Sequence, residues 1–213
     1  AEFNWTQDDT APAPTMTAVD ADGNAVADGA TTNDAYLVLT IETGEATTNF
    51  AVGDITVTGG ALSDFASTDS DTYTVKFTPT ADGATTINIA ANGYTDAGSN
   101  NNTASAEFNW TQDDTAPTIS GVTSSTADGS YTTDDVISIL VVFNEAVTVT
   151  GVPQLTLETG GSDAVVNYTS GSTSTILKFN YTVGAGHTSS DLDYKATTSL
   201  ALNGGTIKDA YGN

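Results

Sequence analysis

Acidic side chains recur at three kinds of position in this chain, and together they could bind a hard cation. Paired aspartates precede a Thr-Ala-Pro tripeptide, acidic residues follow an apolar run, and the pentapeptides "DAGSN" and "DAYGN" come late in each half. The first half supplies Asp8, Asp9, Glu42 or Glu45, Asp96 and Asn100. The second half supplies Asp113, Asp114, Glu145, Asp209 and Asn213. Calcium takes about 6–8 oxygen ligands, so each set is a predicted calcium site.

The order of the strands would bring these distant residues together. If consecutive strands alternate in direction, three places fall at one pole of a domain: its start, the loop after the second strand, and the loop before the last strand. The acidic residues occupy these three places in both halves. We therefore expect one carboxylate-rich pole in each half of the chain.

A further loop, "VDADGNAVADG", follows the first strand and could add Asp20, Asp22 or Asn24 to the second site. The stretch "DADGN" is shorter than an EF-hand loop and lacks its closing glutamate, so a plain turn is the better interpretation. Ordinary linker and turn chemistry is also an alternative for the paired aspartates and for the two pentapeptides.

The charge balance supports a search for cations. Four lysines face 27 acidic residues, which gives a net charge of -23. A chain this acidic has no surface that could replace phosphate counterions, so we exclude nucleic acid as a partner. Self-repulsion of carboxylates destabilises a compact state unless cations neutralise some of them. The alternative is a solvated acidic coat suited to a salty medium.

The absence of cysteine excludes disulfides and thiolate metal sites. No apolar run approaches the roughly 20 residues of a membrane helix, so membrane insertion is not expected. No signal peptide is visible, and we interpret the sequence as a mature form or a piece of a longer protein. A secreted or cell-surface protein without disulfides would gain rigidity from bound calcium or from sandwich packing.

Short β-branched apolar runs separated by Gly, Asp and Asn clusters predict an all-β fold. "DTYTVKFTP" alternates, with Tyr73, Val75 and Phe77 on one face. In the first half we expect strands at Thr15–Val19, Tyr36–Thr43, Ile55–Thr58, Leu62–Phe65, Thr72–Thr78, Thr85–Ala91 and Ala104–Trp110. In the second half we expect them at Ile119–Thr123, Val136–Phe143, Gln154–Glu158, Ala164–Thr169, Thr175–Val183 and Thr198–Leu202. This spacing is typical of Greek-key sandwiches.

The stretch "AEFNWTQDDTAP" occurs at Ala1–Pro12 and again, unchanged, at Ala106–Pro117. Since a spacing of about 100 residues suits a self-contained domain, we predict two tandem Greek-key β-sandwich domains in an extended arrangement. Their ranges are 10–112 and 113–213, with residues 1–9 as an orphan last strand and linker. The second domain stops where the first still has its last strand to come.

The motifs resemble a known family, the bacterial Ig-like domains repeated in large surface adhesins and secreted proteins. "DDTAP" at a domain start, "FNEAV" after the second strand and "DAYGN" before the last carry the resemblance, together with "ETGEATTNF" in the first half. The resemblance implies spacer or extender modules, many of which bind calcium near domain junctions. The expected partners are then neighbouring repeats or copies of the same protein.

Three functions follow as hypotheses. The first is a structural extracellular module made rigid by calcium. The second is a filament subunit, in which Ala1, Glu2, Phe3, Asn4 and Trp5 of one chain complete the second domain of the next by strand addition. The third is an adhesive module for a glycan or a protein receptor, for which the sequence shows no distinct insert.

Catalysis is not predicted. The single histidine, His187, lies in "GAGHTSSD", where a serine and an aspartate are close in sequence, but only geometry across the fold makes a triad. The alternating aromatic residues Phe108 and Trp110 are expected to face a core.

Overall fold

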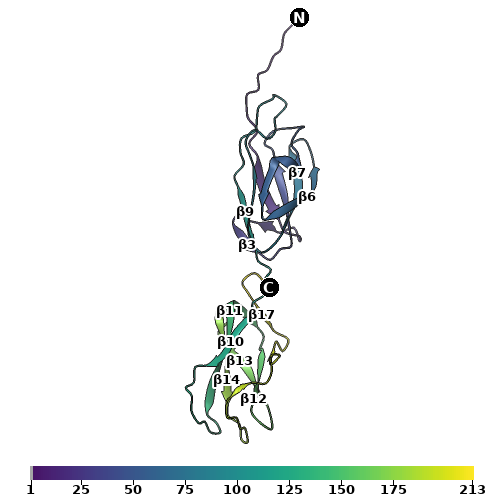
Figure 1. The fold of residues 1–213 in the computed structure, drawn as a ribbon. Helices are drawn as coiled ribbons and strands as arrows, with labels where there is room; N and C mark the ends of the chain where they lie inside the picture. The colour runs from purple at the N-terminus through teal and green to yellow at the C-terminus, as the bar shows by residue number, and fades with distance from the viewer. Residues whose placement is uncertain (1) are drawn as a thin grey trace. The chain divides into compact units, whose positions relative to one another are not determined.

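The computed structural model describes residues 2–213, and the chain divides into two compact units, residues 1–114 and 115–213. Within the described residues the regular structure is β-strand, apart from one short 3₁₀ turn at Val52–Asp54 (Figure 1). No helix in this part of the chain has the length and apolar character that crossing a membrane requires. The predicted role of Ala1 in strand exchange lies outside the described residues.

The first unit is a sandwich of two sheets. Its strands are β1 (Thr15–Val19), β2 (Ala25–Val26), β3 (Ala30–Thr32), β4 (Leu37–Glu42), β5 (Ile55–Thr58), β6 (Gly60–Ser67), β7 (Thr72–Pro79), β8 (Gly83–Ile89) and β9 (Phe108–Gln112). One sheet has the order β2-β1-β4-β7-β6 and the other β3-β9-β8-β5. Neighbouring strands are antiparallel except β3 and β9, which pair in parallel. This order is that of an Ig-like Greek key.

The second unit follows a related plan. Its strands are β10 (Ile119–Ser124), β11 (Val136–Thr150), β12 (Gln154–Glu158), β13 (Ala164–Ser170), β14 (Ser174–Thr182), β15 (Asp193–Tyr194), β16 (Leu200–Ala201) and β17 (Thr206–Lys208). Their order is β10-β11-β14-β13-β12-β15, with β16 also pairing with β12 and β17 with β11. In pairing, β10, β11, β14 and β13 correspond to β1, β4, β7 and β6 of the first unit.

Alternating side chains build the core of the first unit. In β4, Leu37, Leu39 and Ile41 are fully buried, and the residues between them are partly exposed. β7 repeats this pattern with its buried aromatic residues. Because successive side chains in a strand point to opposite faces, each of these strands presents one apolar face to the other sheet.

The closing strand β9 contributes the largest buried side chain of this core. Trp110 is 1 % exposed and meets the ring of Phe77 edge-on, at 6.1 Å between ring centroids. Its indole Nε1 donates a hydrogen bond to Thr32 Oγ1 at 2.9 Å, which satisfies the polar end of the ring. Strand β9 therefore joins β8, β3 and the facing sheet into one core.

The second unit has a separate core centred on β11 and β14. Leu177, Phe179 and Tyr181 alternate inward along β14 against Ile139 and Val141 of β11. β11 is longer than predicted, because after the irregularity between Val142 and Val147 its far end pairs with β17.

The all-β prediction is confirmed, and the predicted bounds Thr15–Val19, Ile55–Thr58 and Gln154–Glu158 match those of strands. The prediction began the last strand of the first unit at Ala104, but regular pairing starts at Phe108. The prediction missed the short strands β2, β3, β15 and β17, because two or three residues carry too little periodicity to be recognised.

The two copies of the repeated stretch offer a matched test of the core. We expect Trp110→Ala to lower the free energy of unfolding of the first unit by about 3–5 kcal/mol, the usual cost of deleting a buried aromatic side chain. Trp5→Ala should leave it unchanged in dilute solution, because Trp5 is 74 % exposed. Chemical denaturation followed by circular dichroism measures both, and equal losses in the two variants would contradict this assignment of the core.

Candidate metal-binding site

The turn that follows β8 holds one carboxylate in a fixed position. Asp96 is 8 % exposed and accepts hydrogen bonds from Asn100, from the backbone N–H at 2.8 Å and from Nδ2 at 2.9 Å. These bonds hold the pKa of Asp96 below its usual range, with the Asn100 side chain as the largest cause. The pentapeptide "DAGSN" thus folds into a closed turn around an ionised carboxylate.

The loop after β4 supplies the second carboxylate, that of Glu45. Thr43, at the base of this loop, is buried. Its Oγ1 donates to the Glu45 carbonyl at 2.8 Å and to the Asp71 carbonyl at 2.9 Å. The Tyr94 hydroxyl donates to the Thr43 carbonyl at 2.9 Å. Since Tyr94 stands two residues before Asp96, this bond ties the Glu45 loop to the Asp96 turn.

The third carboxylate, that of Asp8, comes from the segment that leads into β1. Asn100 Nδ2 donates to the Asp8 carbonyl at 3.2 Å, so one amide braces both Asp8 and Asp96. The segment is held again at Pro12, whose carbonyl accepts from Thr103 N at 2.8 Å. Asn100 therefore directs its amide nitrogen at these neighbours and acts as a brace for the carboxylates.

Two glycines allow the close approach of these segments. A Cβ at Gly98 would lie 3.3 Å from both Asp8 Oδ2 and Asp96 Oδ1, and one at Gly44 would lie 2.8 Å from the backbone nitrogen of Ala13. Gly44 also has a φ of 86°, in the left-handed region that favours glycine. Gly44 therefore needs a residue without a side chain, whereas a Cβ at Gly98 would press on the carboxylates of Asp8 and Asp96.

The three carboxylates converge on one point. One oxygen from each of Asp8, Glu45 and Asp96 lies within 4.8 Å of the others. Two oxygens bound to one calcium ion at about 2.3–2.6 Å each can be at most about 5 Å apart, so this spacing suits a shared ion. Within residues 2–213 no lysine forms an ion pair with these carboxylates. Burial and then the repulsion of Asp8 and Asp96 raise the pKa of Glu45.

The other predicted ligands of the first half lie outside this group. Asp9 accepts a long hydrogen bond from Gln7 Nε2 at 3.5 Å, and Glu42 accepts from Thr72 Oγ1 at 3.1 Å. Asp22 is exposed in a turn in which its N–H donates to Asp20 Oδ1 at 2.9 Å and Asn24 N donates to the same oxygen at 2.8 Å. The stretch "DADGN" is thus a turn closed like that of Asp96.

In the second unit, "DAYGN" forms the same kind of turn. Asp209 is 5 % exposed, and its Oδ1 accepts the N–H groups of Tyr211, Gly212 and Asn213 at 2.8, 2.7 and 2.9 Å. Burial alone would raise the pKa of Asp209, but these donors and the Asn213 side chain hold it below its usual range. Carboxylate oxygens of Asp209 and Glu145 lie within 4.8 Å of each other.

Asp113 and Asp114 belong to the end of the first unit. The N–H of Asp113 donates to the Thr32 carbonyl at 2.9 Å, which extends the pairing of β3 with β9. The N–H of Asp114 donates to Asp82 Oδ1 at 3.1 Å, and hydrogen bonding between the two carboxyl groups raises the pKa of Asp114.

The histidine has a packing contact. The ring of His187 stacks on Tyr181, and its Nδ1 lies 2.8 Å from the tyrosine hydroxyl. The Ser189 hydroxyl donates to the Asp191 carbonyl at 2.7 Å. These hydrogen bonds form no relay from serine through histidine to aspartate among the described residues.

Sequence reasoning missed the residues that support the carboxylates. Tyr94, Thr43 and Gly98 act through contacts between loops that are far apart in sequence, and no local motif marks them. The tyrosine placed two residues before the "DAGSN" aspartate is the one signal that could have been noticed.

Comparisons with curated proteins and with solved structures gave no match. The comparison with family models agrees with this fold. Residues 9–111 match the family model described as bacterial Ig-like domain, a structural family without enzymatic activity whose members are typically extracellular or on the cell surface. The first unit, with its two-sheet Greek key and its carboxylate-rich pole, is therefore a bacterial Ig-like domain.

Proposed function

We propose that the chain is a structural module of an extracellular bacterial protein and that calcium makes it rigid. The observation that carries this proposal is the convergence of Asp8, Glu45 and Asp96 within 4.8 Å, without a lysine partner among the described residues. Three carboxylates packed this closely repel one another, and a bound cation would turn that repulsion into attraction.

The chemistry of the ligands favours calcium over other metals. Every candidate ligand atom is an oxygen, the chain has no cysteine, and its one histidine lies in the other unit. Zinc prefers nitrogen and sulfur ligands, and magnesium demands near-ideal octahedral geometry. Carboxylates from three separate segments form the adaptable kind of site that calcium accepts.

The mechanical consequence follows from where the ligands come from. Asp8 belongs to the segment leading into β1, Glu45 follows β4, and Asp96 follows β8. A shared ion would fasten these three segments to one another and hold the leading segment against the sandwich. Because the ligands are far apart in sequence, only the folded chain would bind the ion, and binding would therefore stabilise the folded state.

A second site is proposed by equivalence. Asp113 stands where Asp8 stands in the repeated stretch, Glu145 lies within β11 at its irregularity, and Asp209 closes the same turn as Asp96. Calcium there would neutralise the carboxylates of Glu145 and Asp209, which lie within 4.8 Å of each other in the second unit.

Calcium should raise the melting temperature of the full chain. At about 100 times the Kd, one ion adds about 2.7 kcal/mol, which corresponds to a rise of about 10–20 °C for a domain of about 100 residues. Scanning calorimetry in calcium, in EGTA and in magnesium at equal ionic strength measures the effect. An unchanged melting curve between calcium and EGTA would contradict the proposal.

Glu45→Gln should act in opposite directions with and without calcium. The raised pKa means that the folded chain disfavours ionised Glu45, and this unfavourable contribution appears as the pH rises through that pKa. At pH 7 without calcium, the neutral glutamine should therefore raise the melting temperature, whereas in calcium it should reduce the calcium-induced rise.

The exposed Glu107 provides the matched control, because Glu107→Gln removes one negative charge from the same unit away from the site. An equal effect of both substitutions on the melting temperature would show that net charge alone causes the change.

Since protonation of Glu45 competes with calcium, the calcium affinity of the wild-type chain should also fall as the pH is lowered from 7 toward the raised pKa of Glu45.

A second candidate function, self-association into filaments, is favoured by the two copies of the repeated stretch. Phe3 and Trp5 are 96 % and 74 % exposed, whereas the identical Phe108 and Trp110 are 6 % and 1 % exposed inside the first unit. We propose that Glu2–Trp5 of one copy pairs with a sheet of another copy by strand addition.

Light scattering of the full chain over a range of concentrations tests self-association. We expect oligomers that grow with concentration, and a monomer when Phe3→Ser and Trp5→Ser are combined. A wild-type chain that stays monomeric at millimolar concentration would contradict this second function.

A further inference from the structure

The second unit has a sheet edge without a strand partner. In the first unit, β8 pairs with β5 along one edge and with β9 along the other. The corresponding strands of the second unit, β15 and β16, pair with β12. Within residues 2–213, no strand pairs with their other edge.

A groove runs beside this open edge. Its volume is about 340 Å³, and it lies between β10 and the segment from β15 to β16, with residues of β11 and β12 at its floor. Its apolar lining consists of Ile119, Val122, Val141, Leu155, Tyr194 and Leu200. Because β10 and the segment from β15 to β16 flank the groove, side chains from one face of an added strand could enter it.

The same place is filled in the first unit. There Phe108 and Trp110 of β9 are buried in the core, and Pro12, Pro14 and Ala18, on and before β1, the counterpart of β10, are buried. No residue of β10 is buried in the second unit, and Ile119 is 47 % exposed. The groove is therefore where a strand equivalent to β9 would insert its aromatic side chains.

We propose that this groove is a strand-acceptor site and that its occupant is the segment Glu2–Trp5 of a second copy of the chain. The choice of donor rests on the self-association proposed above, while the groove itself does not. The sequence Glu-Phe-Asn-Trp is identical to that of Glu107–Trp110, which occupies the equivalent place in the first unit. By analogy with β9 on β8, the donor runs antiparallel to β15 and β16, with Phe3 and Trp5 inward.

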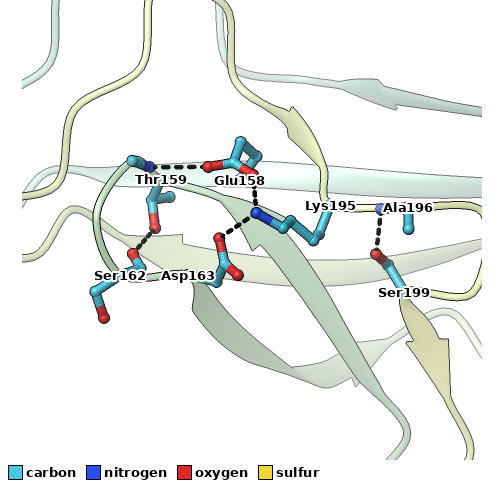
Figure 2. Close-up of polar contacts among 8 residues, drawn as sticks. Glu158, Thr159, Ser162, Asp163, Lys195, Ala196 and Ser199 are labelled. Atoms are coloured by element: carbon cyan, nitrogen blue, oxygen red, sulfur yellow. Dashed lines mark hydrogen bonds and ion pairs between the residues drawn. The ribbon is translucent and has the colours of Figure 1, made fainter.

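The rim of the groove is held in place before a donor arrives. Lys195, between β15 and β16, forms ion pairs with Glu158 and with Asp163, the latter at 3.4 Å (Figure 2). Its backbone N–H donates to the Thr156 carbonyl of β12 at 3.0 Å. Ser199 closes the following turn, accepting from Ala196 N at 2.8 Å through its hydroxyl. A preformed edge lowers the entropic cost of strand addition.

Charge sets the conditions for binding. Two copies with a net charge of -23 each repel one another, and no cationic side chain lines the groove. Apolar burial and backbone hydrogen bonds would then supply the affinity, and salt that screens the repulsion should strengthen it. Binding should thus rise with sodium chloride concentration.

The test uses the full chain carrying Phe3→Ser and Trp5→Ser, so that it has no donor of its own, and a fluorescently labelled peptide with the sequence of residues 1–9. We expect saturable binding by anisotropy, equal in calcium and in EGTA. A control peptide with both aromatic residues replaced by serine should bind at least tenfold more weakly. Equal binding of the two peptides, or no binding of either, would overturn the proposal.

Acceptor variants locate the binding. In the same background, Ile119→Glu or Tyr194→Glu should weaken peptide binding at least tenfold, and both residues are exposed enough for the second unit to remain folded, as circular dichroism would verify. Unchanged binding in both folded variants would reject this groove. Peptide binding together with a monomeric wild-type chain would support the groove and contradict self-association.

Discussion

The mutual repulsion of carboxylates is the constraint on which the account of this chain depends. Four lysines cannot neutralise 27 acidic residues, and at one pole of the first unit the fold holds Asp8, Glu45 and Asp96 within 4.8 Å of one another. Hydrogen bonds support this pole: Asn100 braces two of the three residues, and Tyr94 ties the remaining loop to them. The arrangement is the one that the proposed calcium site requires.

The same chain segment links this pole with the closing strand. In the repeated stretch, the Phe-x-Trp motif of the second copy lies in the strand that closes the first sandwich, and the paired aspartates that follow it end the first unit. The proposed calcium ligands are therefore adjacent in sequence to a strand-completing motif.

Much of the fold could be predicted from the sequence, because alternation in runs such as "DTYTVKFTP" reports directly on a half-buried strand. The parallel pairing of β3 with β9 could not be predicted from the sequence, because Ala30–Thr32 is too short to carry a pattern and its partner strand is about 80 residues away. The convergence of three acidic segments followed from topology alone. Topology could not decide between Glu42 and Glu45. That choice depends on where β4 ends and on the buried Thr43, which turns the chain so that Glu45 reaches the carboxylates of Asp8 and Asp96.

The most direct test of the central claim is a calorimetric titration of the full chain with calcium at pH 7, compared with the chain carrying Asp8→Asn and Asp96→Asn. We expect saturable binding to the wild-type chain and the loss of one class of site in the variant, while the fold is retained. Identical isotherms for the two proteins, or no binding heat together with no calcium-dependent stabilisation of the wild type, would contradict it.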